Sequence, residues 1–279
     1  MTTTVAPVAS AAPSSPRAKV DVAGLVRSEW TKIRSVRSTL WALLLLVVLT
    51  LGFTALFTGL TTAQWDKTDA SQRATIVADP TSAILGAGFQ LSQLAVCVLG
   101  VLVIAGEYSS GTIRASLLAV PRRTPMLAAK VGVFSVLIFI VGEVAAIPSF
   151  FIGAAILHKR APVSLGDSGV LRAVIGAGLY LSVLGVFAIA VGALIRHTAG
   201  GITGIIGFVL VLAPLAQLLP GSVGKHVHAY LPSEAGRLVA QVHQTKDDLL
   251  SPWQGFGVFC LWTVLLLVVA GVLLKRRDA

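Results

Sequence analysis

The sequence has little charge for its length. Charged residues make up 12% of the 279-residue chain, whereas a soluble domain carries about 25%. Hydrophobic residues make up 55%, and they fall in long runs instead of alternating with polar residues. This composition excludes a disordered chain, and it leaves too few polar residues to cover a soluble globule. The composition therefore favours an integral membrane protein.

Motifs that would indicate an enzyme are also absent. The sequence has no G-x-x-x-x-G-K-[ST] segment to bind ATP as a P-loop, and no H-E-x-x-H segment typical of a zinc protease. Cys97 and Cys260 lie in apolar runs and predict no disulfide framework. No carboxylate cluster joins His226, His228 and His243, so we expect a solvated loop there instead of a metal site. A short helix over residues 233–243 that dips into the outer interface is an alternative for the middle of this loop. We therefore expect neither an enzyme nor a cofactor.

Six apolar segments are long enough to cross a bilayer, which takes about 20 apolar residues. They extend over about residues 39–60, 84–105, 131–157, 173–195, 200–219 and 254–274. We therefore predict an all-α, polytopic membrane protein with six transmembrane helices within residues 38–279. Pro148 and Pro214 are expected to kink the third and fifth spans. Residues 1–18 are rich in Ala, Pro, Ser and Thr and predict a disordered tail.

The positive charges predict that both termini lie in the cytoplasm. Most of the 22 lysines and arginines fall before the first span, in the 106–130 connection and after the last span, which all lie on one side. These charges flank apolar runs and form no single basic face, so we expect contact with membrane lipids and not with nucleic acid. The 158–172 connection is the exception, because Lys159, Arg160 and Arg172 fall on the predicted outer side.

Residues 19–37 predict an amphipathic helix before the first span. Apolar residues recur at helical spacing along one face: Val22, Leu25, Val26, Trp30, Ile33 and Val36. Arg27, Lys32 and Arg34 lie on the opposite face. We expect such a helix to lie in the cytoplasmic interface, with its basic residues near anionic lipid. A solvated helix that only follows the positive-inside rule is the alternative.

The connection between the second and third spans, GEYSSGTIRASLLAVPRRTPMLAAK over 106–130, is the most informative segment. Ile113, Leu117 and Val120 form a stripe at i, i+4 and i+7, which predicts a short helix with an apolar edge that ends at Pro121. A short helix held between two spans can transmit a push from a cytoplasmic partner to both spans. A positively charged loop that only fixes topology is the alternative.

Two stretches of the sequence resemble type-2 permeases of ABC transporters. The run Gly106-Glu107-Tyr108-Ser109-Ser110-Gly111-Thr112-Ile113-Arg114, which continues to Leu117-Leu118-Ala119 and Pro121-Arg122-Arg123, is similar to the signature after the second span of that family. The run Glu29-Trp30-Thr31-Lys32-Ile33-Arg34-Ser35 resembles its N-terminal helix. The six-span layout fits as well, so the resemblance covers most of the chain from about residue 20.

The resemblance implies the permease subunit of a bacterial ABC exporter in the plasma membrane. Its pore would pair this chain with a second permease copy or a paralogue, and a separate cytoplasmic ATP-binding subunit would supply the energy. The 106–121 segment would be the coupling helix that docks on that ATPase. The residues implied in this coupling are Glu107, Tyr108, Gly111, Thr112, Ile113, Arg114 and Leu117. Physically, Glu107 can pair with a basic neighbour, and Gly111 permits a turn that other residues resist.

Small and polar residues inside the spans predict faces that avoid lipid. In the second span, one face carries Gly86, Gln90, Gln93, Cys97 and Gly100. This face either lines a substrate path at a dimer seam or packs closely with its glutamines bonded across the contact. In the fourth span, a similar face for helix packing carries Gly178, Ser182, Gly185 and Gly192.

Glu143 lies in the middle of the third span, where a charge is costly. It is either a proton or cation-substrate site, or a neutral carboxyl that is hydrogen-bonded to a neighbouring helix. Two other functions stay open: an ATP-independent transporter or channel coupled to protons through Glu143, and a non-transporting membrane scaffold or immunity protein. The scarcity of polar groups favours a hydrophobic or amphipathic cargo such as a drug, a peptide or a lipid.

Overall fold

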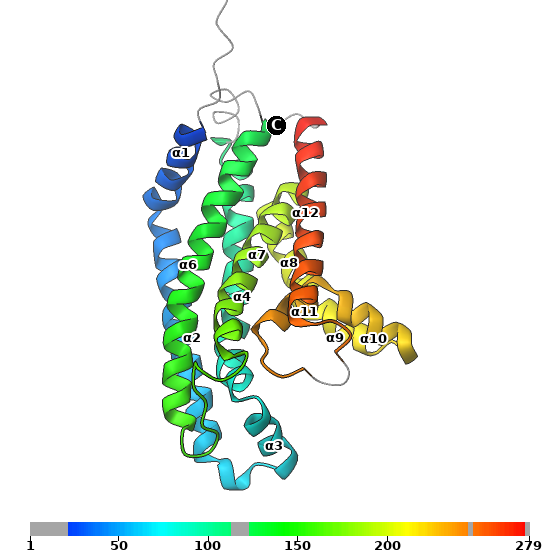
Figure 1. Ribbon diagram of the computed structural model, residues 1–279. Coiled ribbons are helices and arrows are strands. Elements are labelled where there is room, and N and C mark those ends of the chain that lie inside the picture. Colours follow the sequence, from blue (N-terminus) through cyan, green and yellow to red (C-terminus); the bar gives the residue numbers. More distant parts are fainter. Residues whose placement is uncertain (1–21, 113–122, 245–247, 277–279) are drawn as a thin grey trace, which may run out of the picture.

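The chain folds into a bundle of helices. The computed structural model describes residues 22–112, 123–244 and 248–276, and every regular element in these ranges is helical. Helix α1 (Val22–Ser35) and the C-terminus lie at the same end of the bundle (Figure 1). Six of the described helical segments are long and apolar enough to cross a membrane. This confirms the predicted all-α architecture with six transmembrane helices, and the chain is a multi-pass membrane protein.

Most spans extend beyond the limits that the apolar runs predict. The first span is α2 (Arg37–Ala63), and the second span is the C-terminal part of α4 (Pro80–Ser109). The third, fourth and sixth spans are α6 (Arg123–Leu157), α7 (Val170–Ile195) and α12 (Pro252–Arg276). The helices continue into their polar flanks because the helix itself satisfies the backbone N–H and C=O groups. The predicted tail at residues 1–18 lies outside the described residues.

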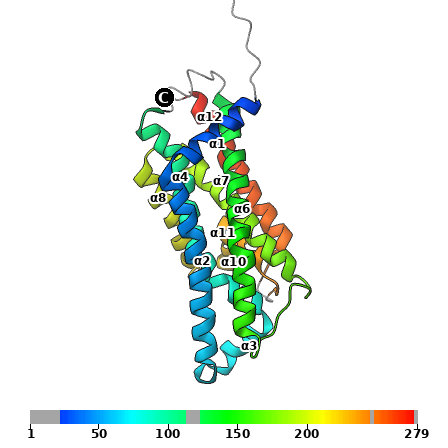
Figure 2. The ribbon, with the colours of Figure 1, turned by 90° about the vertical axis from the view of Figure 1, so that its left-hand side faces the viewer.

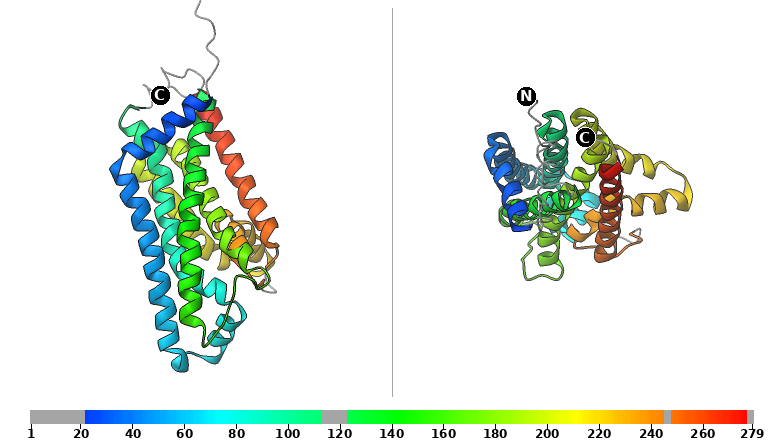
Figure 3. Two further views of the ribbon diagram at one scale, coloured as in Figure 1. Left: turned by 60° about the vertical axis from the view of Figure 1, so that its left-hand side comes forward. Right: turned by 90° about the horizontal axis from the view of Figure 1, so that it is seen from above.

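The fifth span is irregular. It passes from α8 (Thr198–Ile206) through a π-helical turn, η2 (Gly207–Val211), into α9 (Leu212–Gln217). The turn lies just before Pro214, which lacks the N–H that a regular helix would bond to residue 210. The yellow segment that includes the end of this span projects sideways from the bundle (Figure 3, right). In contrast, α6 continues through Pro148 as one helix.

Helix α7 is the centre of the bundle. In the most apolar 18-residue stretch of α7, 78% of the residues are buried, whereas the corresponding fraction is 50% or lower in every other span. Glycines bring α4 and α6 close to it. A Cβ added at Gly100 of α4 would lie 2.7 Å from the carbonyl oxygen of Gly185, and one at Gly142 of α6 would lie 3.1 Å from the Cα of Gly178. The predicted packing face of the fourth span is therefore confirmed.

The connection between the fifth and sixth spans is mostly helical and not a solvated loop. It contains α10 (Gly221–Tyr230), α11 (Pro232–Arg237) and a 3₁₀ turn, η3 (Leu238–Ala240). Helix α11 packs against α12 and α7, and the ring of Phe259 lies against Gly236. Arg172 donates to the carbonyl oxygens of Val239 at 3.1 Å and Gln241 at 2.9 Å. This basic residue on the predicted outer side therefore serves to hold η3 on α7.

A capping residue ties the first outer connection to the last. The first connection contains η1 (Trp65–Lys67) and α3 (Ala70–Ala78), and it ends at Asp79. Asp79 accepts from the N–H of Ser82 at 2.9 Å, which caps α4, and its second oxygen accepts from the N–H of His243 at 3.0 Å. The outer ends of α4 and of the 220–251 connection are thereby fixed to each other.

The contact between α4 and α7 gives a stability test. We expect Gly100→Ala to lower the stability of the detergent-purified protein by about 1–3 kcal/mol, because the new methyl group meets backbone on α7 that cannot move aside. Gly132→Ala is the control, since a Cβ there meets nothing within 4 Å. Thermal unfolding measures both variants, and equal stability of the two would contradict the close packing.

Candidate functional site

Helix α1 presents two apolar edges with different surroundings. Leu25, Glu29 and Ile33 follow one another at four-residue spacing and are buried against the bundle. Val22 and Trp30 lie on the adjacent edge and are 65% and 46% exposed. The helix crosses the ends of α4 and α6 diagonally (Figure 2). One edge of the predicted amphipathic helix thus packs on protein, and the other is available to lipid.

A carboxylate on the buried edge of α1 joins three helices. Glu29 is 3% exposed, and its two oxygens accept from Lys32 at 2.6 Å and from Lys130 of α6 at 2.7 Å. Both lysines also reach Glu107 near the end of α4, at 3.0 Å and 2.8 Å. We call these four residues the ion cluster. It fastens α1 to the two helices that flank the 110–122 connection.

The charges in the ion cluster stabilise one another. Burial by itself would raise the pKa of Glu29, but the charges and hydrogen bonds of Lys130 and Lys32 outweigh it, and that pKa lies below its ordinary value. Burial would lower the pKa of Lys32, but its hydrogen bonds and charge interactions with Glu29 and Glu107 raise it instead. Glu29 and Lys32 therefore stay ionised around neutral pH.

The predicted coupling residues lie partly in this cluster. Glu107 pairs with two lysines, as the sequence predicts, and the ring of Tyr108 lies 5.0 Å from the guanidinium of Arg196. Gly111 adopts a positive φ of 72°, which is the turn expected there. The hydroxyl groups of Thr112 and Ser110 are 2.9 Å apart. Ile113, Arg114 and Leu117 lie outside the described residues.

Sequence reasoning missed most of the ion cluster. Glu29 was expected only as part of the resembling N-terminal stretch, Lys32 as a basic residue near anionic lipid and Lys130 as a topology signal. The available signal was the position of Glu29, four residues after Leu25 and four before Ile33 on the apolar stripe. A carboxylate within such a stripe requires a buried cationic partner.

The polar face of the second span divides into two parts. Cys97 and Gly100 pack in the core, where Gly100 contacts α7. Gln90 and Gln93, nearer the outer end, line a cavity of about 220 Å³. Within it, the hydroxyl of Tyr180 donates to the side-chain oxygen of Gln93 at 3.0 Å. Cys97 and Gly100 thus pack as the packing alternative requires, and Gln93 is bonded across the contact with α7, but Gln90 and Gln93 also border open space, so both alternatives stay open. We call this space the inner cavity.

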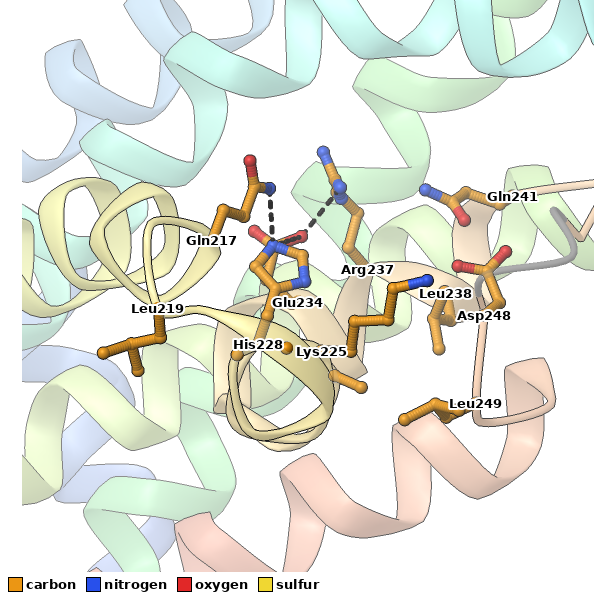
Figure 4. Close-up of a pocket in the computed structure, with 13 residues that line it drawn as sticks. Gln217, Leu219, Lys225, His228, Glu234, Arg237, Leu238, Gln241, Asp248 and Leu249 are labelled. Carbon is orange, nitrogen blue, oxygen red and sulfur yellow. Dashed lines mark hydrogen bonds and ion pairs between the residues drawn. The ribbon is translucent and has the colours of Figure 1, made fainter.

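A second cavity adjoins the inner cavity. This outer pocket, of about 490 Å³, lies under α10 and α11 (Figure 4). Its walls combine Leu219, Leu238 and Leu249 with the charged residues Lys225, Glu234, Arg237 and Asp248. Gln217, Glu234 and Arg237 line both cavities. His228 also lines the outer pocket, and no group of three metal-ligating side chains occurs within the described residues.

Glu143 lies at the contact between α6 and α7. Its carboxyl group packs against Gly178, where any Cβ would collide with it. Both carboxyl oxygens are buried and have no hydrogen-bond partner among the described residues. The ionisable side chains of α7 are engaged elsewhere: Arg172 on η3 and Tyr180 on Gln93. The bond to a neighbouring helix that a structural role requires is therefore not found in this part of the chain.

No protein-family model matches the chain, and no curated protein is significantly similar to it. Inference about function therefore depends on the geometry of the ion cluster and the two cavities, together with the resemblance of the 106–123 segment.

The ion cluster predicts a strong dependence of stability on Glu29. We expect Glu29→Gln to cost about 3–5 kcal/mol, because Lys130 is left as a buried charge with one partner fewer. Asp66→Asn is the matched control. It removes a carboxylate from a pair with Arg160 whose side chains are 80% and 40% exposed, which is worth at most about 1 kcal/mol. Thermal or denaturant unfolding of the detergent-purified protein measures both.

The same comparison has a defined pH dependence. Because the pKa of Glu29 is lowered on folding, its contribution is fully present above the ordinary carboxyl value of 4.5 and is lost as the pH falls through the folded value. Because the pKa of Lys32 is raised, its contribution is lost only above the ordinary lysine value of 10.5. The difference between wild type and Glu29→Gln should stay constant between these limits and shrink in acid. A difference that grows in acid would contradict the cluster.

Replacing Glu143 should change stability in the opposite direction from replacing Glu29. We expect Glu143→Met to raise stability by about 1–3 kcal/mol, because it removes a buried polar group that has no partner among the described residues. Gln93→Met is the control and should lower stability, because it leaves the hydroxyl of Tyr180 without its acceptor. If both variants destabilise the protein equally in thermal unfolding, then the carboxyl group of Glu143 has a stabilising partner after all.

Proposed function

We propose that the chain is the membrane-spanning permease subunit of an ATP-driven ABC exporter. The ion cluster carries this proposal, because it fastens α1 to the helices on both sides of the 110–122 connection. That connection lies within the stretch that resembles the type-2 permease signature. A separate cytoplasmic ATPase would dock on it, and a second permease copy or a paralogue would complete the pore.

The cluster explains how a push on the connection could reach the cavities. Salt bridges among α1, α4 and α6 prevent the inner ends of these helices from moving independently. A displacement at Glu107 is carried along α4 to Gln93, which is 14 residues or about 21 Å away. Gln93 lines the inner cavity, so the docking segment and the cavity share one rigid element.

The proposal places the ion cluster on the cytoplasmic side of a bacterial plasma membrane. The same end of the bundle carries α1 and the C-terminus (Figure 1). Arg196, which follows α7, is also on this side of the predicted topology, and the positive-inside rule supports a cytoplasmic location for such a basic end. The opposite end carries α10 and α11, so both cavities would open toward the outside.

A second candidate function is a proton-coupled transporter that needs no ATPase. The observation that favours it is the carboxyl group of Glu143, which is buried in a span with no partner among the described residues. An ionisable residue inside the membrane is by default a functional candidate. The ATPase-driven exporter is preferred because the ion cluster and the 106–123 signature point to the same segment.

Cross-linking from Thr112 tests the exporter. Thr112 is exposed at the start of the connection, and a cysteine there should cross-link to a co-expressed ATPase from the neighbouring reading frame. Gln64→Cys is exposed at the far end of α2 and should give no product. In intact cells, a membrane-impermeant maleimide should label Gln64→Cys and not Thr112→Cys. The reverse labelling, or absence of the Thr112 product, would contradict the proposal.

A further inference from the structure

The two cavities meet at a small polar network. The side-chain nitrogen of Gln217 at the end of α9 lies 2.8 Å from Nε2 of His228 on α10. The same Nε2 lies 3.7 Å from Glu234 of α11, and Arg237 donates to Glu234 at 2.7 Å. Figure 4 shows these four side chains converging at one wall of the outer pocket. Three of them also line the inner cavity, so the network lies between the two spaces.

The inner cavity contains polar groups that are available to a ligand. Ser233 is 5% exposed, lines this cavity, and its hydroxyl has no hydrogen-bond partner among the described residues. Gln93 also lines it and carries two N–H donors on the amide whose oxygen is bonded to Tyr180. A buried hydroxyl without a partner is costly in an apolar surrounding, and a bound polar group would satisfy it.

The charges around the inner cavity cancel. Glu234 and Arg237 are its charged lining residues, and they form a salt bridge with each other. The opposite wall is apolar and comes from the fifth span, with Val209, Ala213 and Pro214. A volume of about 220 Å³ is below the range of about 300–1,000 Å³ that holds a drug-sized ligand. The cavity therefore suits a small uncharged group that forms hydrogen bonds.

We propose that Gln217, His228, Glu234 and Arg237 form a gate between the outer pocket and the inner cavity, and that the inner cavity binds a small uncharged, hydrogen-bonding group of the substrate. This inference rests on the proposed transport function, and it names the substrate class and the outer barrier. Side-chain contacts of the gate join the end of α9 to α10 and α11, which follow each other directly along the chain. It opens when α9, α10 or α11 shifts, without breaking any backbone hydrogen bond within a helix.

Cysteine accessibility tests the gate without a known substrate. Ser233→Cys places a thiol of similar size in the inner cavity, and Leu249→Cys places one in the outer pocket, each with Cys97 and Cys260 replaced by alanine. The probes are membrane-impermeant methanethiosulfonates added to intact cells. We expect the outer-pocket thiol to react rapidly and the inner-cavity thiol at least about tenfold more slowly, a ratio equivalent to about 1.4 kcal/mol. Equal rates would exclude a gate.

Matched variants identify the gate residues. Glu234→Gln keeps the size of the side chain but removes the ion pair with Arg237, and His228→Ala removes the contacts with Gln217 and Glu234. Each should raise the reaction rate at Ser233→Cys about tenfold and leave the rate at Leu249→Cys unchanged. His226→Ala is the control on the same helix, because His226 is exposed and its ring contacts the carbonyl of Ser222. If the control accelerates the reaction as much as His228→Ala, the network is not the gate.

A pair of charged reagents tests the ligand class. The trimethylammonium-ethyl and sulfonato-ethyl methanethiosulfonates should react with Ser233→Cys in the same ratio as with Leu249→Cys, within about threefold, because the inner cavity has no net charge. In the Glu234→Gln background, the ratio at Ser233→Cys should shift toward the anionic reagent. A strong preference for one charge in the otherwise unaltered protein would overturn the uncharged ligand class.

The outcome can be separated from failure of the proposed function. Slow modification of the inner thiol that is unaffected by Glu234→Gln refutes the gate and leaves the Thr112 cross-link intact. Modification of the outer-pocket thiol only from the cytoplasmic side would instead refute the membrane orientation on which the exporter depends. Both measurements use the full-length protein in its membrane and require no ATPase.

Discussion

Inside a bilayer, a polar group cannot form hydrogen bonds with water, so it must find its partner within the protein. This requirement determines where the helices meet. The ion cluster satisfies it where α1 meets the ends of α4 and α6. Glu29 and Lys130 are 3% and 2% exposed, and each carries two ionic contacts. The position of α1 follows, because its buried edge must bring Glu29 to Lys130 of α6 and Lys32 to Glu107 of α4.

Away from the ion cluster, the helices are held together by close packing at small residues and not by salt bridges. The glycines of α7 and α4 remove the side chains that would hold the two helices apart, and α7 becomes the most buried span. Toward the outer end the packing is less complete, and Gln93, Tyr180 and Ser233 border open volume instead. The helices are thus tightly joined at one end and leave room at the other, an arrangement suited to a protein that opens on one side.

The sequence was sufficient to predict the helical architecture, because runs of about 18 to 20 apolar residues are typical of membrane-spanning helices. It was also sufficient for the turn at Gly111, which is a local property, and it predicts a basic partner for Glu107 without identifying Lys32 and Lys130, which lie 75 and 23 residues away. It was insufficient for Glu29 and Lys130, which lie 101 residues apart and meet only through the packing of α1 on α6. In the 220–251 connection, the sequence indicates a short helix near α11 and η3 as an alternative, but not α10. The contacts that hold α11 and η3 in place, with Phe259 and Arg172, are encoded by no local pattern.

The π-helical turn in the fifth span has a consequence for the outer end of the bundle. A π-helical turn contains about one residue more than an α-helical turn. Converting it to a regular α-helix would therefore rotate the residues that follow it by about 100° around the helix axis. Gln217 lies six residues past this turn, and its amide would then swing to a different side of the helix axis, away from His228. The backbone register of one short stretch thereby sets whether Gln217 reaches His228, the contact that we propose separates the two cavities.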